Sequence, residues 1–176
     1  LYDHPDAISG LAAAIGDMEE KIFALLLKAP AEIYRVGGNY DSTMQNPDFF
    51  REYIMPYLRD RAERLHQADK FLLTHTDGEN DGLLDLYLDC GFDVAESLCP
   101  APMTKVSLKE YRRIFGNRIT IWGGIPSLLM LKESFSEYEF DRHLDDFFEA
   151  IGDGSRFVIS VADTTPPDAD FDRIER

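Results

Sequence analysis

The chain has 176 residues and a formal net charge of -15 at pH 7. This length allows one domain with a substantial core. The negative charge argues against a nucleic-acid partner, whose phosphates it would repel. No apolar run approaches the roughly 20 residues that span a membrane, so no membrane partner is expected. Two cysteines are too few for a disulfide framework, which favours a reducing, cytoplasmic setting.

The first third of the chain predicts two helices and a short strand. Apolar residues at spacings of three and four predict a helix over Asp6–Leu27. A short strand then runs into a Gly-rich turn within Ala31–Asn39. Asn46, followed by a proline, is typical of a helix start. Pro56 falls inside this second helical pattern and should kink it.

Strands and helices continue to alternate through the rest of the chain, and short apolar strands are typical of a parallel sheet covered on both faces. The predicted strands are Phe71–His75, Phe92–Glu96, Ile119–Gly124 and Arg156–Val161, and the predicted helices are Asp81–Asp89, Ser107–Phe115, Ser136–Ala150 and one beginning near Asp168.

Two α/β folds place their sites at the carboxyl ends of such strands, the (β/α)8 TIM barrel and the doubly wound sheet. No Gly-rich phosphate fingerprint opens a helix here, which favours the barrel. Five strands do not close an eight-stranded barrel. We therefore expect a single domain over residues 1–176 that supplies about five βα units, strands 4–8, of a longer chain. The absence of an initiator Met fits this expectation, and an oligomeric partner that completes the sheet is the alternative.

The apolar run Phe71–His75 ends in a histidine, and Asp77 follows two residues later. Side chains two apart on a strand point the same way, so His75 and Asp77 should project together before Gly78 turns the chain. This geometry suits a metal site or an acid/base pair. It is equally that of a strand end whose histidine and aspartate are solvated or bonded to each other.

Further polar side chains fall at or just after the other strand ends. We expect His75, Asp77, Glu96 and Asp163 to meet at one mouth, where one imidazole and three carboxylates can hold a divalent metal. Without a metal, the clustered carboxylates would repel one another, and a raised pKa would suit Asp77 or Glu96 to acid/base catalysis. The alternative is that the four are not close in space. Asn39, Tyr40 and Trp122 are expected to line the substrate pocket.

Five motifs, taken in order and spacing, resemble those of the uroporphyrinogen decarboxylase-like superfamily, in its C-terminal half. That superfamily has a (β/α)8 barrel fold, and it includes uroporphyrinogen decarboxylases, zinc-using corrinoid-dependent methyltransferases and, more distantly, cobalamin-independent methionine synthase. The motifs are Pro47–Pro56, His75–Gly78, Cys90–Asp93, Trp122–Pro126 and Asp163–Pro167.

The resemblance also implies site residues. His75 falls on the histidine of the methyltransferases' His-x-Cys motif, and Glu96 falls on the glutamate of methionine synthase. Asp77 stands where the first cysteine would be, and Asp163 or Ala162 stands near the second. Both thiolates are therefore absent, which implies a harder, oxygen-rich metal site, with zinc still the first candidate. Cys99 could supply a thiol from a loop, although a small apolar role suits it better.

The resemblance predicts a methyltransferase-like enzyme that moves a methyl group from a small methylated substrate, with a corrinoid protein as the expected acceptor. Metal-free decarboxylation of a porphyrinogen is the first alternative. It fits less well, because Gly123-Gly124-Ile125-Pro126-Ser127 and Val161-Ala162-Asp163 depart from the decarboxylase motifs. A partial barrel that serves as a non-catalytic interaction domain is the second.

Overall fold

The computed structural model describes residues 3–176, so Leu1 and Tyr2 of the predicted domain lie outside the described residues. Its centre is a five-stranded parallel sheet in the order β1-β2-β3-β4-β5, which is also the chain order. Each strand is linked to the next through helical segments, as expected for successive units of a (β/α) barrel. The strands are β1 (Ile33–Arg35), β2 (Phe71–His75), β3 (Val94–Leu98), β4 (Thr120–Ile125) and β5 (Phe157–Val161).

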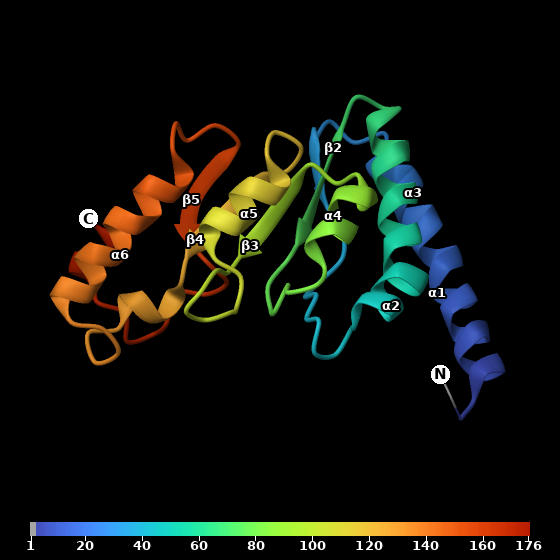
Figure 1. Cartoon of the computed structure of the whole chain (residues 1–176). Helices are drawn as coiled ribbons and strands as arrows, with labels where there is room; N and C mark the ends of the chain where they lie inside the picture. The colour runs from blue at the N-terminus through green and yellow to red at the C-terminus, as the bar shows by residue number, and fades with distance from the viewer. Residues whose placement is uncertain (1–2) are drawn as a thin grey trace.

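The main helices between the strands lie on one face of this sheet, in front of the strands in Figure 1, and the N-terminal helix lies at the side of the sheet. This arrangement confirms the predicted α/β fold as part of a (β/α) barrel, while the assignment to strands 4–8 stays a prediction. The helical segments are α1 (Pro5–Leu26), α2 (Pro47–Phe49), the π-helical turn η1 (Phe50–Ile54), α3 (Met55–His66), α4 (Leu84–Cys90), α5 (Leu108–Phe115), the 3-10 turn η2 (Ser127–Met130), α6 (Glu137–Ile151) and α7 (Phe171–Ile174).

Side-chain caps begin three of the helices where the sequence predicts them. The Asn46 side chain accepts a hydrogen bond from the Phe49 amide, and Ser107 accepts one from the Glu110 amide. Ser136 and Glu139 form a reciprocal capping box at the start of α6. These bonds satisfy amide groups that have no partner within the helix.

Pro56 produces the predicted irregularity in the second helical segment. A proline has no amide to bond the carbonyl four residues earlier, so the regular ladder is broken there. The structure accommodates the break by a π-helical turn over Phe50–Ile54, in which the Met55 amide bonds the Phe50 carbonyl, five residues back. The helix then continues as α3 to His66.

The strand register divides the side chains of the sheet between two faces. Thr74, Ala95 and Ile121 are paired across β2, β3 and β4 and lie under the helices, where each is completely buried. The core on this side is rich in aromatic rings, with Tyr87 in contact with Tyr40, Phe50 and Phe92.

The opposite face carries a row made of His75, Glu96, Trp122 and Val158, which are paired across β2 to β5. We call this the lumen face, because it would line the inside of a closed barrel. No helix among residues 3–176 covers it, so the expectation of a sheet covered on both faces is wrong for the described part of the chain. Ile33, Phe71, Trp122 and Val158 are all more than a third exposed as a result.

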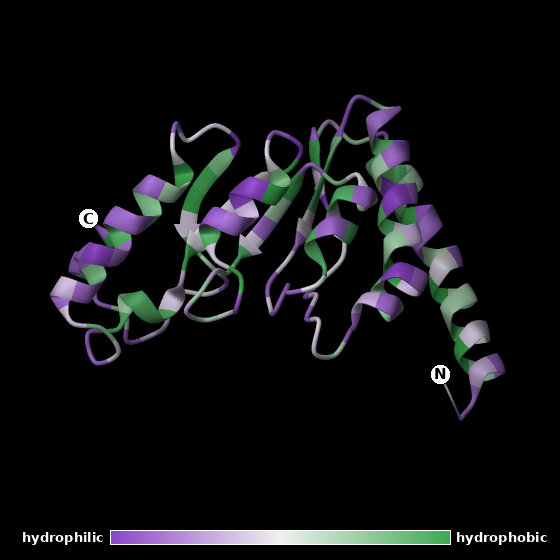
Figure 2. Cartoon of the chain, in the orientation of Figure 1, coloured by the Kyte–Doolittle hydropathy of each residue, from purple (hydrophilic) through white to green (hydrophobic). Residues whose placement is uncertain are grey.

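Helix α1 also presents an uncovered apolar side. Its Phe23 is buried against Arg61 and Arg64 of α3. The apolar stripe from which the helix was predicted lies exposed, and Figure 2 shows apolar residues along the part of α1 that extends beyond the other helices. Its exposed members are Ile8, Leu11, Ile15, Met18, Ile22 and Leu25.

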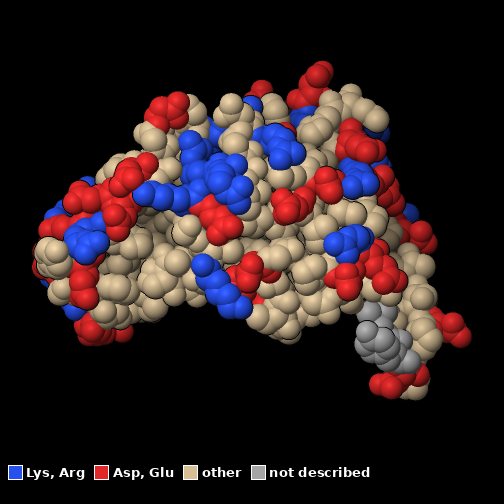
Figure 3. Space-filling view, viewed as in Figure 1, with Lys and Arg blue, Asp and Glu red and all other residues tan. Residues whose placement is uncertain are grey.

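The surface agrees with the acidic composition. Asp and Glu side chains are scattered over the face seen in Figure 3, whereas Lys and Arg gather near its middle. In the part of the chain that the structure describes, no helix combines the length and apolarity needed to cross a bilayer.

Candidate functional site

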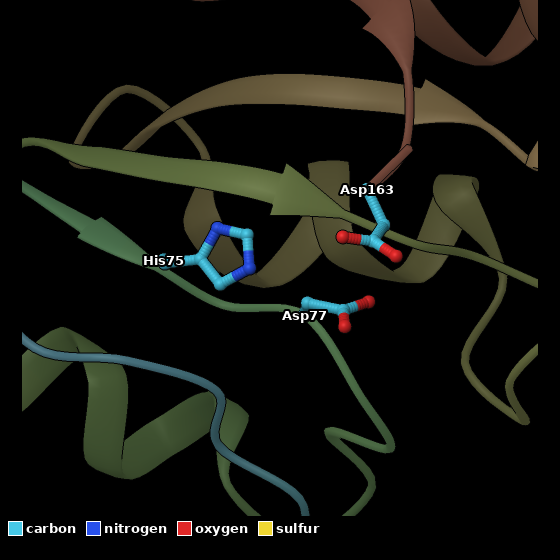
Figure 4. Close-up of side chains that lie close together, drawn as sticks. All are labelled: His75, Asp77 and Asp163. Atoms are coloured by element: carbon cyan, nitrogen blue, oxygen red, sulfur yellow. The ribbon is translucent and has the colours of Figure 1, made fainter. Parts of the chain in front are cut away.

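His75, Asp77 and Asp163 come together at the carboxyl ends of the strands, as the sequence predicts. His75 is the last residue of β2, Asp77 follows in the next turn, and Asp163 comes two residues after the end of β5. One donor atom from each side chain lies within 4.8 Å of the others. Figure 4 shows the two carboxylates turned toward each other, with the imidazole beside them.

The imidazole of His75 is held by Glu96, its neighbour in the register. The Nδ1 atom of His75 lies 2.6 Å from Oε2 of Glu96. When Nδ1 donates to a carboxylate, the neutral ring keeps a lone pair on Nε2. A ring nitrogen faces the two aspartates in Figure 4, and Nε2 is the one left to do so. His75 thus offers a ligand nitrogen of fixed orientation.

Glu96 therefore stands behind the histidine. The predicted four-residue metal set becomes a set of three, and Glu96 is absent from the group of donors that converge. Its Oε2 also lies 3.8 Å from Nε of Arg35, whose side chain is exposed on the lumen face. Glu96 is thus shared between a histidine and a guanidinium, and this ties its carboxylate to the sheet.

Asp77 is half-buried and lies close to the second carboxylate of the cluster, that of Asp163. Burial, followed by the nearby charge of Asp163, raises the pKa of its carboxyl group above the ordinary value. Nδ2 of Asn39 lies 3.4 Å from Oδ2 of Asp77, so the predicted pocket residue Asn39 does reach the site. A carboxyl group with a raised pKa can donate a proton, and a metal ion can equally take the proton's place.

The turn that carries Asp77 is fixed from the core by Asn80, which is completely buried. Its Nδ2 atom donates to the carbonyls of Thr76, at 3.0 Å, and Gly78, at 2.6 Å. Its Oδ1 atom accepts a hydrogen bond from the hydroxyl of Tyr87. Thr76 in turn donates its hydroxyl and its amide to the Glu96 carbonyl. The backbone on either side of Asp77 is therefore held in place.

Two predicted pocket residues lie in different environments. Tyr40 does not line the site: it is 4% exposed, its ring packs edge-on against Phe50, and its hydroxyl bonds Thr74. Tyr40 is therefore a core residue. Its position in the sequence does not distinguish a core role from a pocket role. Trp122 lies on the lumen face next to Glu96 in register and is 38% exposed. It borders a largely apolar cavity of about 290 Å³ whose lining includes none of the three converging residues.

Cys99 does not supply the missing thiolate. Its side chain is buried, and burial together with the charges of Asp77 and Asp163 raises its thiol pKa to about 12. Cys99 is also absent from the converging donors in the described part of the chain. The small, apolar role expected for it agrees with this environment.

Sequence reasoning missed Arg35, Asn80 and Ser97, which contact residues of the site. Arg35 lies near Glu96, Asn80 bonds the turn that carries Asp77, and Ser97 Oγ accepts a hydrogen bond from the Asp163 amide. Arg35 had a usable signal, because it occupies an outward position on a short strand that ends beside the predicted pocket. Asn80 and Ser97 had none, because their roles depend on hydrogen bonds to backbone groups whose positions a sequence does not give.

Comparisons with known proteins agree with this architecture. A solved methyltransferase from Methanosarcina mazei shares the fold with a TM-score of 0.58 at 19% sequence identity. The match covers 80% of this chain and 40% of that protein, so the chain spans well under half of its length. A search of curated proteins found no match. The family model described as Uroporphyrinogen decarboxylase (URO-D) matches residues 1–176. The chain therefore belongs to the uroporphyrinogen decarboxylase family.

Proposed function

We propose that this chain provides the metal-binding half of a methyltransferase-like enzyme, with His75, Asp77 and Asp163 as the ligands of one divalent cation. The observation that carries the proposal is the convergence of three donor atoms within 4.8 Å at the carboxyl end of a barrel-type sheet. The methyltransferase that shares the fold supports the reaction class only through that likeness.

The donor set fits a divalent cation. Zinc accepts imidazole nitrogen and carboxylate oxygen, and catalytic zinc sites keep three protein ligands and one open position. Two carboxylates and one imidazole also suit manganese or magnesium better than a thiolate site would. The first metal to test is therefore zinc, with manganese as the comparison. When bound, the cation would act as a Lewis acid on the atom that carries or receives the methyl group.

The protein's own residues have separate tasks in this proposal. His75 presents Nε2 because Glu96 holds Nδ1, and Asn39 holds one oxygen of Asp77. We propose Trp122, which is exposed on the lumen face beside Glu96 in register, as an apolar wall for the substrate. A small methylated molecule can lie against this wall while its polar end reaches the three ligands. A corrinoid protein is the proposed methyl acceptor.

The lumen face also needs a cover for this chemistry. Ile33, Phe71 and Val158 are 52%, 49% and 42% exposed there, and charged ligands act most strongly where water is excluded. We propose that further barrel strands, or a second subunit, close this face. The resulting protein would work in the cytoplasm, where its two buried thiols stay reduced.

Metal analysis tests the proposal directly. We expect the protein, purified without chelator, to hold close to one equivalent of zinc or manganese, and His75→Ala to lose it. His66→Ala is the matched control, because His66 is also bonded to a carboxylate, that of Asp93, but lies before β2 at the other end of the sheet. Metal content well below one equivalent in the wild type, or equal content in His75→Ala, contradicts the proposal.

A second candidate function follows from the raised pKa of Asp77. Without a metal, Asp77 would donate the proton in a decarboxylation of the type that gives the family its name. The acidic mouth disfavours this, because a substrate with many carboxylates requires guanidinium partners. Incubation with uroporphyrinogen separates the two functions: formation of coproporphyrinogen by metal-free protein favours the decarboxylase. If a stable, folded protein neither binds a metal nor forms coproporphyrinogen, the non-catalytic interaction domain is the function that remains.

A further inference from the structure

The carboxyl end of β3 has an unusual backbone where it passes the site. Four non-glycine residues among 3–176 have a positive φ, and two of them, Ser97 at 62° and Asp163 at 58°, lie at the candidate site. The other two, Asp69 and Arg156, precede strands at the opposite end of the sheet. A non-glycine residue keeps this conformation only where its surroundings impose it, and such residues gather at functional sites.

Ser97 owes its conformation to a β-bulge. Glu96 pairs with Trp122 and Leu98 with Gly123, so β3 advances two residues where β4 advances one. Ser97 is the extra residue. The bulge presses β3 against β4: a Cβ atom at Gly123 would lie 2.7 Å from the Leu98 carbonyl oxygen. Bulges of this kind redirect a side chain next to an active site.

The bulge directs the Ser97 hydroxyl toward the end of β5, past the intervening strand β4. Ser97 Oγ accepts a hydrogen bond of 2.6 Å from the backbone amide of Asp163, although the two residues are 66 positions apart. The preceding residue, Ala162, is bonded through its amide to the Ile125 carbonyl of β4. Ser97 is 2% exposed, so water does not compete freely for this bond.

We propose that Ser97 is a positioning residue, which fixes the Asp163 backbone so that its carboxylate meets His75 and Asp77. The inference rests on the proposed metal site, and it explains how an exposed aspartate on the segment after β5 is kept at a site built on β2. Without this bond, the Asp163 peptide is anchored through Ala162 alone. Asp163 would then sample positions in which its carboxylate no longer faces the other two ligands.

The test compares Ser97→Gly and Ser97→Ala with the wild-type protein after chelator treatment. Glycine adopts a φ of about 60° without strain, so Ser97→Gly removes the hydroxyl and keeps the bulge. Ser97→Ala removes the hydroxyl in a strained backbone, so agreement between the two variants assigns the effect to the hydroxyl. Ser127→Ala is the matched control, because Ser127 is also buried but bonds only the Met103 sulfur.

Titration with Zn²⁺ gives the first readout. Loss of a group that orients a metal ligand typically lowers affinity about 10–100-fold. We expect this loss of Zn²⁺ affinity for Ser97→Gly at a temperature where circular dichroism shows the variant to be folded. A Zn²⁺ affinity of Ser97→Gly within twofold of the wild-type value would overturn the inference. If the wild type itself binds no Zn²⁺ or Mn²⁺, the metal proposal fails and the second readout decides the role of Ser97.

That second readout is amide hydrogen exchange and needs no metal. The Asp163 amide should be protected in the wild type and exchange at least tenfold faster in Ser97→Gly. The Thr76 amide, which bonds the Glu96 carbonyl on the same strand, should keep its rate in both proteins. Equal protection of Asp163 in both proteins would show that Ser97 does not hold it, whether or not a metal binds.

Discussion

Substitution of Asn80 offers the sharpest test of how the site is supported. Its side chain is completely buried and makes three hydrogen bonds, two to the turn that carries Asp77 and one with Tyr87. In Asn80→Ala, the buried Thr76 carbonyl and the buried Tyr87 hydroxyl both lose this partner. The Gly78 carbonyl lies in a partly exposed turn, so we expect water to replace the amide there.

The expected loss of stability in Asn80→Ala follows from the two buried groups that lose a partner, the Thr76 carbonyl and the Tyr87 hydroxyl. A buried polar group left without a partner costs about 1–3 kcal/mol, so Asn80→Ala should lower the free energy of unfolding by about 2–6 kcal/mol. Tyr87→Phe leaves only the Asn80 side-chain oxygen without its partner, so it should lower the free energy of unfolding by about 1–3 kcal/mol. In the double variant the Tyr87 hydroxyl is gone, so the combined loss should be smaller than the sum of the single losses.

Urea denaturation followed by circular dichroism measures all three variants. The expected order of stability is wild type, Tyr87→Phe, then Asn80→Ala. A loss below about 1 kcal/mol in Asn80→Ala would refute the reasoning, because the amide would then not be the support of this turn. Strictly additive losses would show that Asn80 and Tyr87 act independently, contrary to their shared hydrogen bond.

Two further predictions concern the backbone and the charge of the site. Gly123→Ala should lower stability by about 3 kcal/mol or more, because its Cβ atom would meet Leu98 and its φ is 135°. Gly116→Ala, with φ of 52° and open space around the Cβ position, should cost only about 1 kcal/mol, and equal urea midpoints for the two variants would contradict this. In metal-free protein, Asp77→Asn should raise the melting temperature at pH 7 by about 2–4 °C, since the carboxylate oxygens of Asp77 and Asp163 lie within 4.8 Å of each other and repel by about 1 kcal/mol even in water. A carboxyl group with a raised pKa destabilises the folded state when ionised, so this gain should shrink as the pH falls toward about 4, and a lower melting temperature for the variant at pH 7 would contradict it.

Local signals in the sequence were sufficient for most of the elements. The apolar run of β2 and the capping residues of α6 give their elements to within a residue, because each depends on neighbours in the chain. The convergence of His75, Asp77 and Asp163 was also predictable, since parallel strands place their carboxyl ends at one edge. What could not be predicted depends on contacts distant in the chain.

Glu96 illustrates that limit. Its position at the end of a predicted strand suited a metal ligand, but β3 extends to Leu98, and the register places Glu96 against Nδ1 of His75. A shift of one or two residues in the strand register decides whether a carboxylate contacts the metal itself or the histidine that binds the metal. Tyr40 shows the same limit, because an aromatic residue in a turn can face a pocket or fill the core.

The row of side chains across the lumen face has one more consequence. Trp122 is the single tryptophan of the chain and is the register neighbour of Glu96. Its indole is 38% exposed, so any molecule that displaces water from this surface should shift its fluorescence emission to shorter wavelength. The protein therefore contains its own optical reporter, and ligand libraries can be screened against it without a label.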